Sequence, residues 1–315
     1  MKSITIGKFR GLQQIASTRG TFTALALDHR QNLRKANPAF VEDAMLSAFK
    51  LDVVENLANC ATAVLLDPEV SAAQAIAAHA LPGNVGLVVA LESTGYTGDA
   101  SARKAQIIPG WSVEKAKRMG ASAIKLLVYY HPESEAASET EEFVAAVARD
   151  CQKQDLVLML ESLSYSLHEG VKLSSEEKRR VVVETARRLT PLGIDIFKAE
   201  FPLQVQDSDE SRWAEACLEI TKASITPWVL LSAAVDYDTF LRQVVAACNA
   251  GASGIAVGRA VWQEAVTMNV DERRRFLGTI AAERLTRLTS LCTALATPFT
   301  EYYESQAPFD WVRSY

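Results

Sequence analysis

Eight short apolar runs recur along the chain, and segments with helical periodicity lie between them. Such runs, enriched in Val, Ile and Leu, are typical of buried parallel strands. They span Phe22–Leu27, Ala63–Leu66, Gly86–Leu91, Ala123–Tyr130, Leu156–Leu163, Ile194–Phe201, Trp228–Ala234 and Gly254–Gly258. Eight strand–helix alternations favour a closed (β/α)8 TIM barrel over an open α/β sheet.

The intervening segments support this prediction. Helical periodicity is clear in Glu141–Gln154, Ser175–Leu189, Ser211–Lys222 and Tyr237–Ala250. Capping residues, Ser174 and Ser138, precede two of them. No Gly-x-Gly-x-x-Gly follows the first run, which weakens a dinucleotide-binding alternative. No linker divides the chain, so we expect one barrel domain over residues 1–315, with residues 271–315 as a C-terminal helical extension.

Composition excludes several classes of protein. Hydrophobic residues make up 49% and charged residues 23%, as in an ordinary globular enzyme. A net charge of −5 argues against a nucleic-acid partner. There is no long apolar run and no signal-peptide pattern, so we expect a cytoplasmic protein with no membrane partner. The sequence leaves open whether the protein forms a homo-oligomer. The five scattered cysteines, Cys60, Cys151, Cys217, Cys248 and Cys292, favour reduced thiols over a disulfide frame.

Three charges stand inside the apolar runs. Lys125, Glu161 and Lys198 belong to the fourth, fifth and sixth runs. A buried ammonium is costly unless it is paired or gives up its proton. A neutral lysine amine is a nucleophile that can form a Schiff base with a carbonyl compound. Two lysines and a carboxylate on consecutive strands therefore indicate an imine-forming lyase.

The alternation of side chains along a strand predicts that these charges meet. If they point into the barrel, they converge with Asp28, which follows the first run. In such barrels the active site lies at the carboxyl ends of the strands. A purely structural ion pair between Lys125 and Glu161 is the alternative.

An anion site is expected after the last two strands. Ser232 ends the seventh run, and Gly258 and Arg259 end the eighth. Loops at this place in the barrel commonly bind phosphate through backbone N–H groups. The forked guanidinium of Arg259 suits an anion.

These residues stand in motifs that resemble the class I tagatose-1,6-bisphosphate aldolase family, part of a wider group that includes deoxyribose-phosphate aldolase. The matching pieces are Ala26-Leu27-Asp28-His29-Arg30, Glu92-Ser93-Thr94-Gly95-Tyr96, Ala123 to Tyr130, Phe197-Lys198-Ala199-Glu200-Phe201-Pro202, Leu231-Ser232-Ala233 and Gly258-Arg259-Ala260-Val261-Trp262. They keep the family's order from the first strand to the last.

The resemblance implies a role for each matching residue. It makes Lys198 the Schiff-base lysine, Lys125 its assistant, Glu161 the acid/base group and Asp28 a group that orients hydroxyls or relays protons. It places phosphate on Ser232 and Arg259. We expect the remaining residues that bind the substrate or its phosphates to be Gly258, Arg30, His29 and Glu92. The implied reaction is reversible cleavage of a sugar phosphate, tagatose 1,6-bisphosphate, to dihydroxyacetone phosphate and glyceraldehyde 3-phosphate, with no metal and no organic cofactor.

Three positions depart from the family pattern. His29 replaces a glutamine, Ala234 a glycine, and Ser93 a lysine. All lie near the expected phosphates or hydroxyls, so they leave the imine chemistry intact but put the sugar in question. The sulfofructose-phosphate aldolases share most of these motifs, which makes 6-sulfofructose 1-phosphate an alternative substrate.

Two other readings stay open. A metal-dependent aldolase could use His29, His131 and His168, which follow strands on the active-site side. A non-catalytic sugar-phosphate sensor could keep the same pocket, although it has little need for a buried nucleophile.

Overall fold

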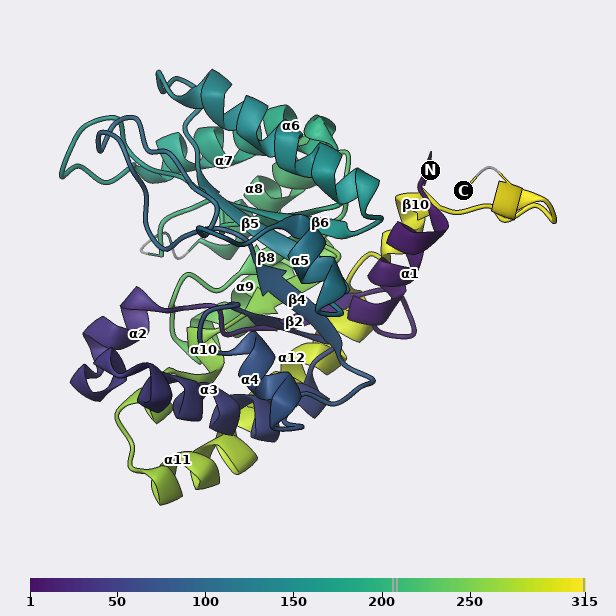
Figure 1. The fold of residues 1–315 in the computed structure, drawn as a ribbon. Coiled ribbons are helices and arrows are strands. Elements are labelled where there is room, and N and C mark those ends of the chain that lie inside the picture. The colour runs from purple at the N-terminus through teal and green to yellow at the C-terminus, as the bar shows by residue number, and fades with distance from the viewer. Residues whose placement is uncertain (206, 208, 314) are drawn as a thin grey trace.

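Strands β2 to β9 form a closed parallel barrel (Figure 1). A computed structural model describes residues 1–205, 207, 209–313 and 315. The barrel strands are β2 Phe22–Ala26, β3 Ala63–Leu66, β4 Gly86–Ala90, β5 Ala123–Tyr129, β6 Val157–Leu163, β7 Ile196–Ala199, β8 Trp228–Leu231 and β9 Gly254–Val257. The predicted barrel is therefore confirmed, with several strands shorter than the apolar runs that predicted them.

Side chains alternate between two apolar layers. The layer inside the barrel is built from small and medium side chains such as Ala24, Val88, Ala123 and Val229. The outer layer, between strands and helices, holds the alternate positions of the same strands. In the register of the sheet, Glu161 of β6 lies beside Lys198 of β7. The predicted inward face of each charged strand is thus the observed one.

Helices cover the outside of the barrel (Figure 1). They are α2 Gln31–Ala36, α3 Asp43–Leu57, α4 Ala72–Ala77, α5 Val113–Arg118, α6 Ala137–Lys153, α7 Ser175–Leu189, α8 Glu210–Ala223, α9 Tyr237–Asn249, α10 Arg259–Trp262, α11 Val270–Phe276 and α12 Ala282–Leu295. Ser174 caps α7 in a box with Glu177, as predicted. The Ser138 cap is wrong, because α6 begins one residue earlier and encloses that serine. C-terminal helices follow the last strand as expected, and α12 packs against α9 and α3 in the outer ring.

Helix α1 (Ile6–Ile15) closes the amino-terminal end of the barrel. The Lys8 ammonium donates to Asp195 Oδ2 at 2.7 Å, and both side chains are buried. A short parallel pair, β1 (Lys2–Ser3) with β10 (Tyr303–Glu304), ties the two ends of the chain together. This end of the barrel is filled, so the opposite end is the open one.

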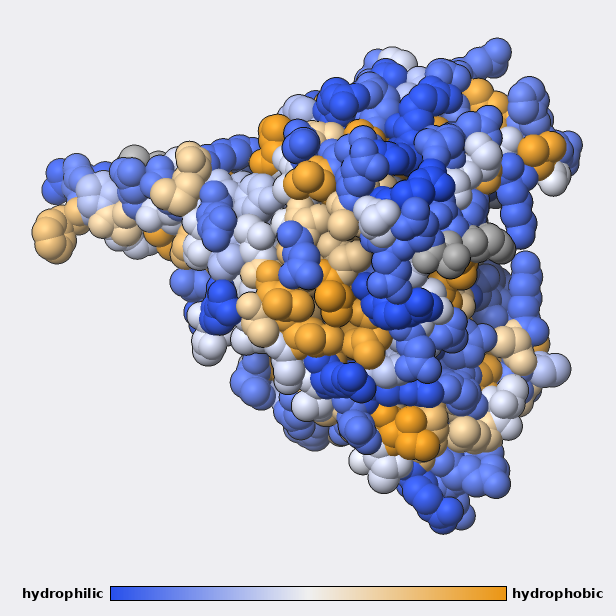
Figure 2. All heavy atoms as spheres, turned by 180° about the vertical axis from the view of Figure 1, so that it is seen from behind, coloured by the Kyte–Doolittle hydropathy of each residue, from blue (hydrophilic) through white to orange (hydrophobic). Residues whose placement is uncertain are grey.

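Beyond β10 the chain projects from the barrel (Figure 1, Figure 2). Phe309 is fully exposed there, and the Tyr315 hydroxyl donates to Asp155.

All five cysteines are free thiols. Within the part of the chain that the structure covers, no helix has the length and apolar character needed to cross a membrane.

Candidate active site

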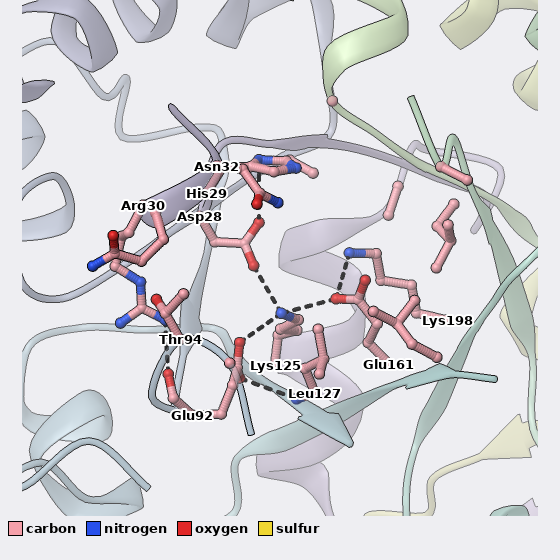
Figure 3. Close-up of a pocket in the computed structure, with 18 of the residues that line it drawn as sticks. Asp28, His29, Arg30, Asn32, Glu92, Thr94, Lys125, Leu127, Glu161 and Lys198 are labelled. Atoms are coloured by element: carbon pink, nitrogen blue, oxygen red, sulfur yellow. Dashed lines mark hydrogen bonds and ion pairs between the residues drawn. The ribbon is translucent and has the colours of Figure 1, made fainter. Parts of the chain in front are cut away.

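Five charged side chains meet at the open end of the barrel, on the floor of a cavity of about 750 Å³ (Figure 3). Lys125 is at the centre of the cluster: its Nζ lies 2.8 Å from Asp28 Oδ2, 2.6 Å from Glu92 Oε1 and 2.8 Å from Glu161 Oε2. Lys198 Nζ lies 2.8 Å from the same Glu161 Oε2. The charges that were predicted to converge are therefore in direct contact.

The carboxylates fix the charge of Lys125. Burial alone would lower the pKa of its ammonium, but Asp28, Glu161 and Glu92 outweigh burial and hold this pKa well above its usual value. Burial likewise opposes the charged forms of Asp28 and Glu161, yet the lysines hold the pKa of both carboxyls below the usual range. Lys125 therefore stays protonated and keeps Glu161 ionised. Three carboxylates balance the charge of Lys125, so these contacts give little support to an assisting role in which its positive charge repels the ammonium of Lys198.

Glu92 is held more rigidly than its partners. Its Oε1 accepts from Lys125, and its Oε2 accepts from the Leu127 backbone N–H at 3.0 Å. Burial raises the pKa of this carboxyl despite the contact with Lys125. With both oxygens occupied, Glu92 anchors Lys125, although it also lines the cavity as expected for a substrate-site residue.

The predicted anion site lies on one side of this cluster. Ser232, Gly258 and Arg259 all line the cavity. The Gly258 N–H donates to Ser232 Oγ at 3.4 Å. Among the described residues, no carboxylate forms an ion pair with the Arg259 guanidinium, and burial lowers the pKa of this group. The cradle thus combines a backbone donor, a hydroxyl and an unpaired cation.

The turn that carries Ser232 has an unusual backbone. Ala233 and Ala234 have φ of 44° and 60°, in the left-handed region. The Val235 N–H donates to the Ser232 carbonyl at 3.0 Å and closes a tight turn. Left-handed alanines are strained, and strain of this kind is often kept at functional sites.

His29 stands beside the cradle. Its ring meets Trp262 edge-to-face with centroids 5.5 Å apart, and its Nδ1 has no hydrogen-bond partner in the described part of the chain. Burial lowers the pKa of His29 to about 4, with only partial compensation from Asp28. The imidazole is therefore neutral at pH 7, and its buried Nδ1 lies 4.0 Å from Asp28 Oδ1.

Arg30 reaches the far side of the cavity. Its Nη2 donates to the Glu92 carbonyl at 2.8 Å, and its Nη1 pairs with Glu69. Sequence reasoning missed Glu69, and its only signal was its place in the polar stretch directly after β3. Sequence reasoning also missed the cover formed by the loop after β4, where the Arg103 guanidinium packs 4.6 Å from the Tyr96 ring centroid and 4.7 Å from that of Tyr165.

The histidines proposed for a metal do not form one site. His131 is buried, and its Nδ1 accepts from the Glu133 backbone N–H at 3.2 Å. Across the residues that the structure describes, no group of three or more His, Cys, Asp or Glu side chains has an arrangement that could hold a metal ion.

A parallel barrel with a cluster of buried charged residues in a cavity at the carboxyl ends of its strands is the architecture of a barrel enzyme. Comparison with known proteins agrees with this class. The family model described as "DeoC/LacD family aldolase" matches residues 22–264, and the chain belongs to that family. It is therefore an enzyme, an aldolase.

Individual relatives extend over most of the chain. A tagatose 1,6-diphosphate aldolase of Streptococcus agalactiae is 28% identical and covers 95% of this chain and 99% of its own. Tagatose 1,6-diphosphate aldolase 2 of Enterococcus faecalis is 30% identical, over 84% of this chain and 86% of its own. An archaeal fructose 1,6-bisphosphate aldolase matches with a TM-score of 0.60 at 24% identity, over 91% of this chain and 99% of its own, which shows the shared fold.

Proposed function

We propose that this aldolase is a class I enzyme that cleaves a ketose phosphate reversibly into dihydroxyacetone phosphate and an aldehyde. One observation carries the proposal: Lys198 Nζ lines a cavity and lies 2.8 Å from Glu161 Oε2, a proton acceptor held ionised by a second lysine. An amine needs such an acceptor before it can attack a carbonyl.

The steps follow from these contacts. Lys198 transfers a proton to Glu161 and attacks C2 of the ketose. The carbinolamine loses its hydroxyl as water, with the proton supplied by Glu161, and an iminium forms. A base, Glu161 or Asp28, removes the C4 hydroxyl proton, the C3–C4 bond breaks, and its electron pair moves into the iminium to give an enamine and a free aldehyde. Protonation at C3 and hydrolysis then release dihydroxyacetone phosphate and restore Lys198.

Arg259, Ser232 and the Gly258 N–H would hold the phosphate on C1. Ser232 follows β8, the neighbour of β7, and Gly258 and Arg259 follow β9, the next strand. This position supports the role, because a phosphate bound there leaves C2 within reach of Lys198. His29 and Asp28 would contact the hydroxyls between the two ends. The reaction as proposed uses no metal and no organic cofactor, and it belongs in the cytoplasm, where sugar phosphates are found.

Two substrates are compatible with this chemistry. Tagatose 1,6-bisphosphate is the first candidate, because curated relatives are tagatose 1,6-diphosphate aldolases. A ketose 1-phosphate, including 6-sulfofructose 1-phosphate, is the second. The candidates differ in the group at the end far from C1, and tagatose also differs from fructose in its configuration at C4.

Trapping of the imine tests the proposal directly. Borohydride added with dihydroxyacetone phosphate should inactivate the enzyme and attach a reduced triose phosphate to the peptide that holds Lys198. The Lys198→Arg variant should neither be labelled nor turn over substrate, since a guanidinium stays protonated. Turnover should persist in a chelator.

Three results would contradict the proposal. Label on Lys125 would exchange the roles of the two lysines. Loss of activity in chelator with no borohydride effect would indicate a metal mechanism. Binding of sugar phosphates without turnover would identify a sensor.

A further inference from the structure

The two sides of the cavity differ in charge. Ser232 and Arg259 follow β8 and β9, whereas Arg30 reaches over β3 and β4 to Glu69 and the Glu92 carbonyl. In the order of the barrel, β4 lies opposite β8. Figure 3 shows Arg30 and Thr94 on the side of the cavity away from Lys198. A ketose whose C1 phosphate is in the cradle would therefore extend its far end toward Arg30.

The cation at that far end is already neutralised. Arg30 is 7% exposed, and its guanidinium is bound by the Glu69 carboxylate and the Glu92 carbonyl. In the adjoining recess, of about 310 Å³, Arg34 is likewise paired with Asp43. Each arginine has its own carboxylate, so the recess carries no net positive charge.

Arg30, Ser93 and Thr94 form the far wall of the cavity, here called the Arg30–Ser93 wall, and its side chains other than Arg30 are uncharged. Ser93 and Thr94 line both the cavity and the recess. A phosphate or sulfonate placed there would have to displace Glu69 from Arg30 or lie beside that carboxylate. Like charges at short range are costly, and a desolvated anion needs a cation or several donors.

Lys35 is the remaining cation in the lining of the cavity. It is exposed on α2, and it does not line the recess that Arg30, Ser93 and Thr94 share. Arg259, in contrast, is partly buried.

We propose that the substrate carries an anion only at the C1 end and ends in a neutral hydroxyl at the Arg30–Ser93 wall, so that the chain prefers ketose 1-phosphates to ketose 1,6-bisphosphates. Arg30 held by Glu69, together with neutral Ser93, sets this preference. The inference rests on the proposed aldolase function. Among the candidate substrates of that function it selects a ketose 1-phosphate with a neutral distal end, in place of tagatose 1,6-bisphosphate and 6-sulfofructose 1-phosphate.

The test compares kcat/KM for matched pairs of substrates. The pairs are tagatose 1-phosphate with tagatose 1,6-bisphosphate, and fructose 1-phosphate with fructose 1,6-bisphosphate, with 6-sulfofructose 1-phosphate as a second distal anion. For the faster sugar, kcat/KM of the monophosphate should exceed that of the bisphosphate, and that of 6-sulfofructose 1-phosphate, by at least about tenfold, the value of one missing charge-assisted contact.

Two variants should reverse the preference by adding one positive charge to the wall. Ser93→Lys supplies an ammonium, and Glu69→Gln releases the Arg30 guanidinium. Each should shift the ratio of kcat/KM toward the bisphosphate by about ten- to a hundredfold. Ser93→Gln, which is long but neutral, is the matched control and should leave the ratio in place.

A wild-type ratio below about tenfold, or a ratio that neither charged variant shifts, overturns the inference. A selective loss of bisphosphate turnover in the Lys35→Gln variant would also overturn the inference, because Lys35 would then be the partner of a distal anion. Trapping of dihydroxyacetone phosphate on Lys198 separates this failure from failure of the proposed function, because that triose has no distal end.

Discussion

At the scale of single residues, one carboxylate oxygen joins both lysines: Glu161 Oε2 accepts from Lys125 and from Lys198. Replacing Glu161 with Gln keeps the shape of the side chain but removes proton transfer. We expect kcat to fall by about 10²- to 10⁴-fold, the usual range for a general acid–base group, while sugar phosphate still binds. Steady-state kinetics and a binding titration measure this. An unchanged kcat would move the proton shuttle to Asp28.

His29 gives a second prediction at this scale. Its pKa is about 4 when folded and 6.5 in a model peptide. The unfolded chain therefore binds a proton between these values while the folded chain does not, so stability falls as the pH drops from 6.5 toward 4. The contribution of His29 is of order 3 kcal/mol at most.

The measurement is the free energy of unfolding of wild type and His29→Gln from pH 7 to pH 4. The difference between the two should shift in favour of the variant as the pH falls. A constant difference across this range would show that His29 has the same pKa in the folded and unfolded chain.

At the scale of elements, the turn after β8 holds two left-handed alanines, Ala233 and Ala234. A non-glycine residue in this conformation costs about 1–2 kcal/mol. Glycine removes this strain, but it also raises the conformational entropy of the unfolded chain, which offsets part of the stabilisation. We therefore expect Ala234→Gly to stabilise the protein by about 0.5–1 kcal/mol. Urea unfolding measures this.

The same substitution in a helix is the control. Ala246 lies inside α9, where glycine should destabilise by about 0.5–1 kcal/mol. Equal destabilisation at both positions would mean that the turn is not left-handed in solution.

At the scale of the whole molecule, helix α1 and the barrel depend on one buried ion pair, Lys8 with Asp195. Burial raises the pKa of Asp195, and Lys8 offsets this only in part. The Lys8→Met substitution leaves the buried Asp195 carboxylate without its partner, so we expect the free energy of unfolding to fall by about 3–5 kcal/mol. The double variant with Asp195→Asn should recover part of it. Equal stability of the single and double variants would argue against a pair.

Much of this architecture follows from the sequence, because apolar runs define strands and a period of two defines their inner faces. The convergence of Lys125, Glu161 and Lys198 followed from that period alone. Strand ends were overestimated at Ile194 and Ala234, which lie outside the strands. Ile194 is apolar because it is buried beside the barrel, whereas Ala234 is an exposed alanine in the left-handed turn after β8. Glu69 and the Arg103 cover were missed, because contacts between loops leave no periodic signal.

The sharing of Glu161 has a bearing on which way the reaction runs. When Glu161 takes up a proton, Lys125 still has Asp28 and Glu92 at 2.8 Å and 2.6 Å, so no buried cation is isolated. The cluster can therefore hold Glu161 in either its ionised or its protonated form with little rearrangement. We therefore expect the same resting geometry to serve carbon–carbon bond synthesis as readily as bond scission, which makes the enzyme a starting point for building ketose phosphates from simple aldehydes.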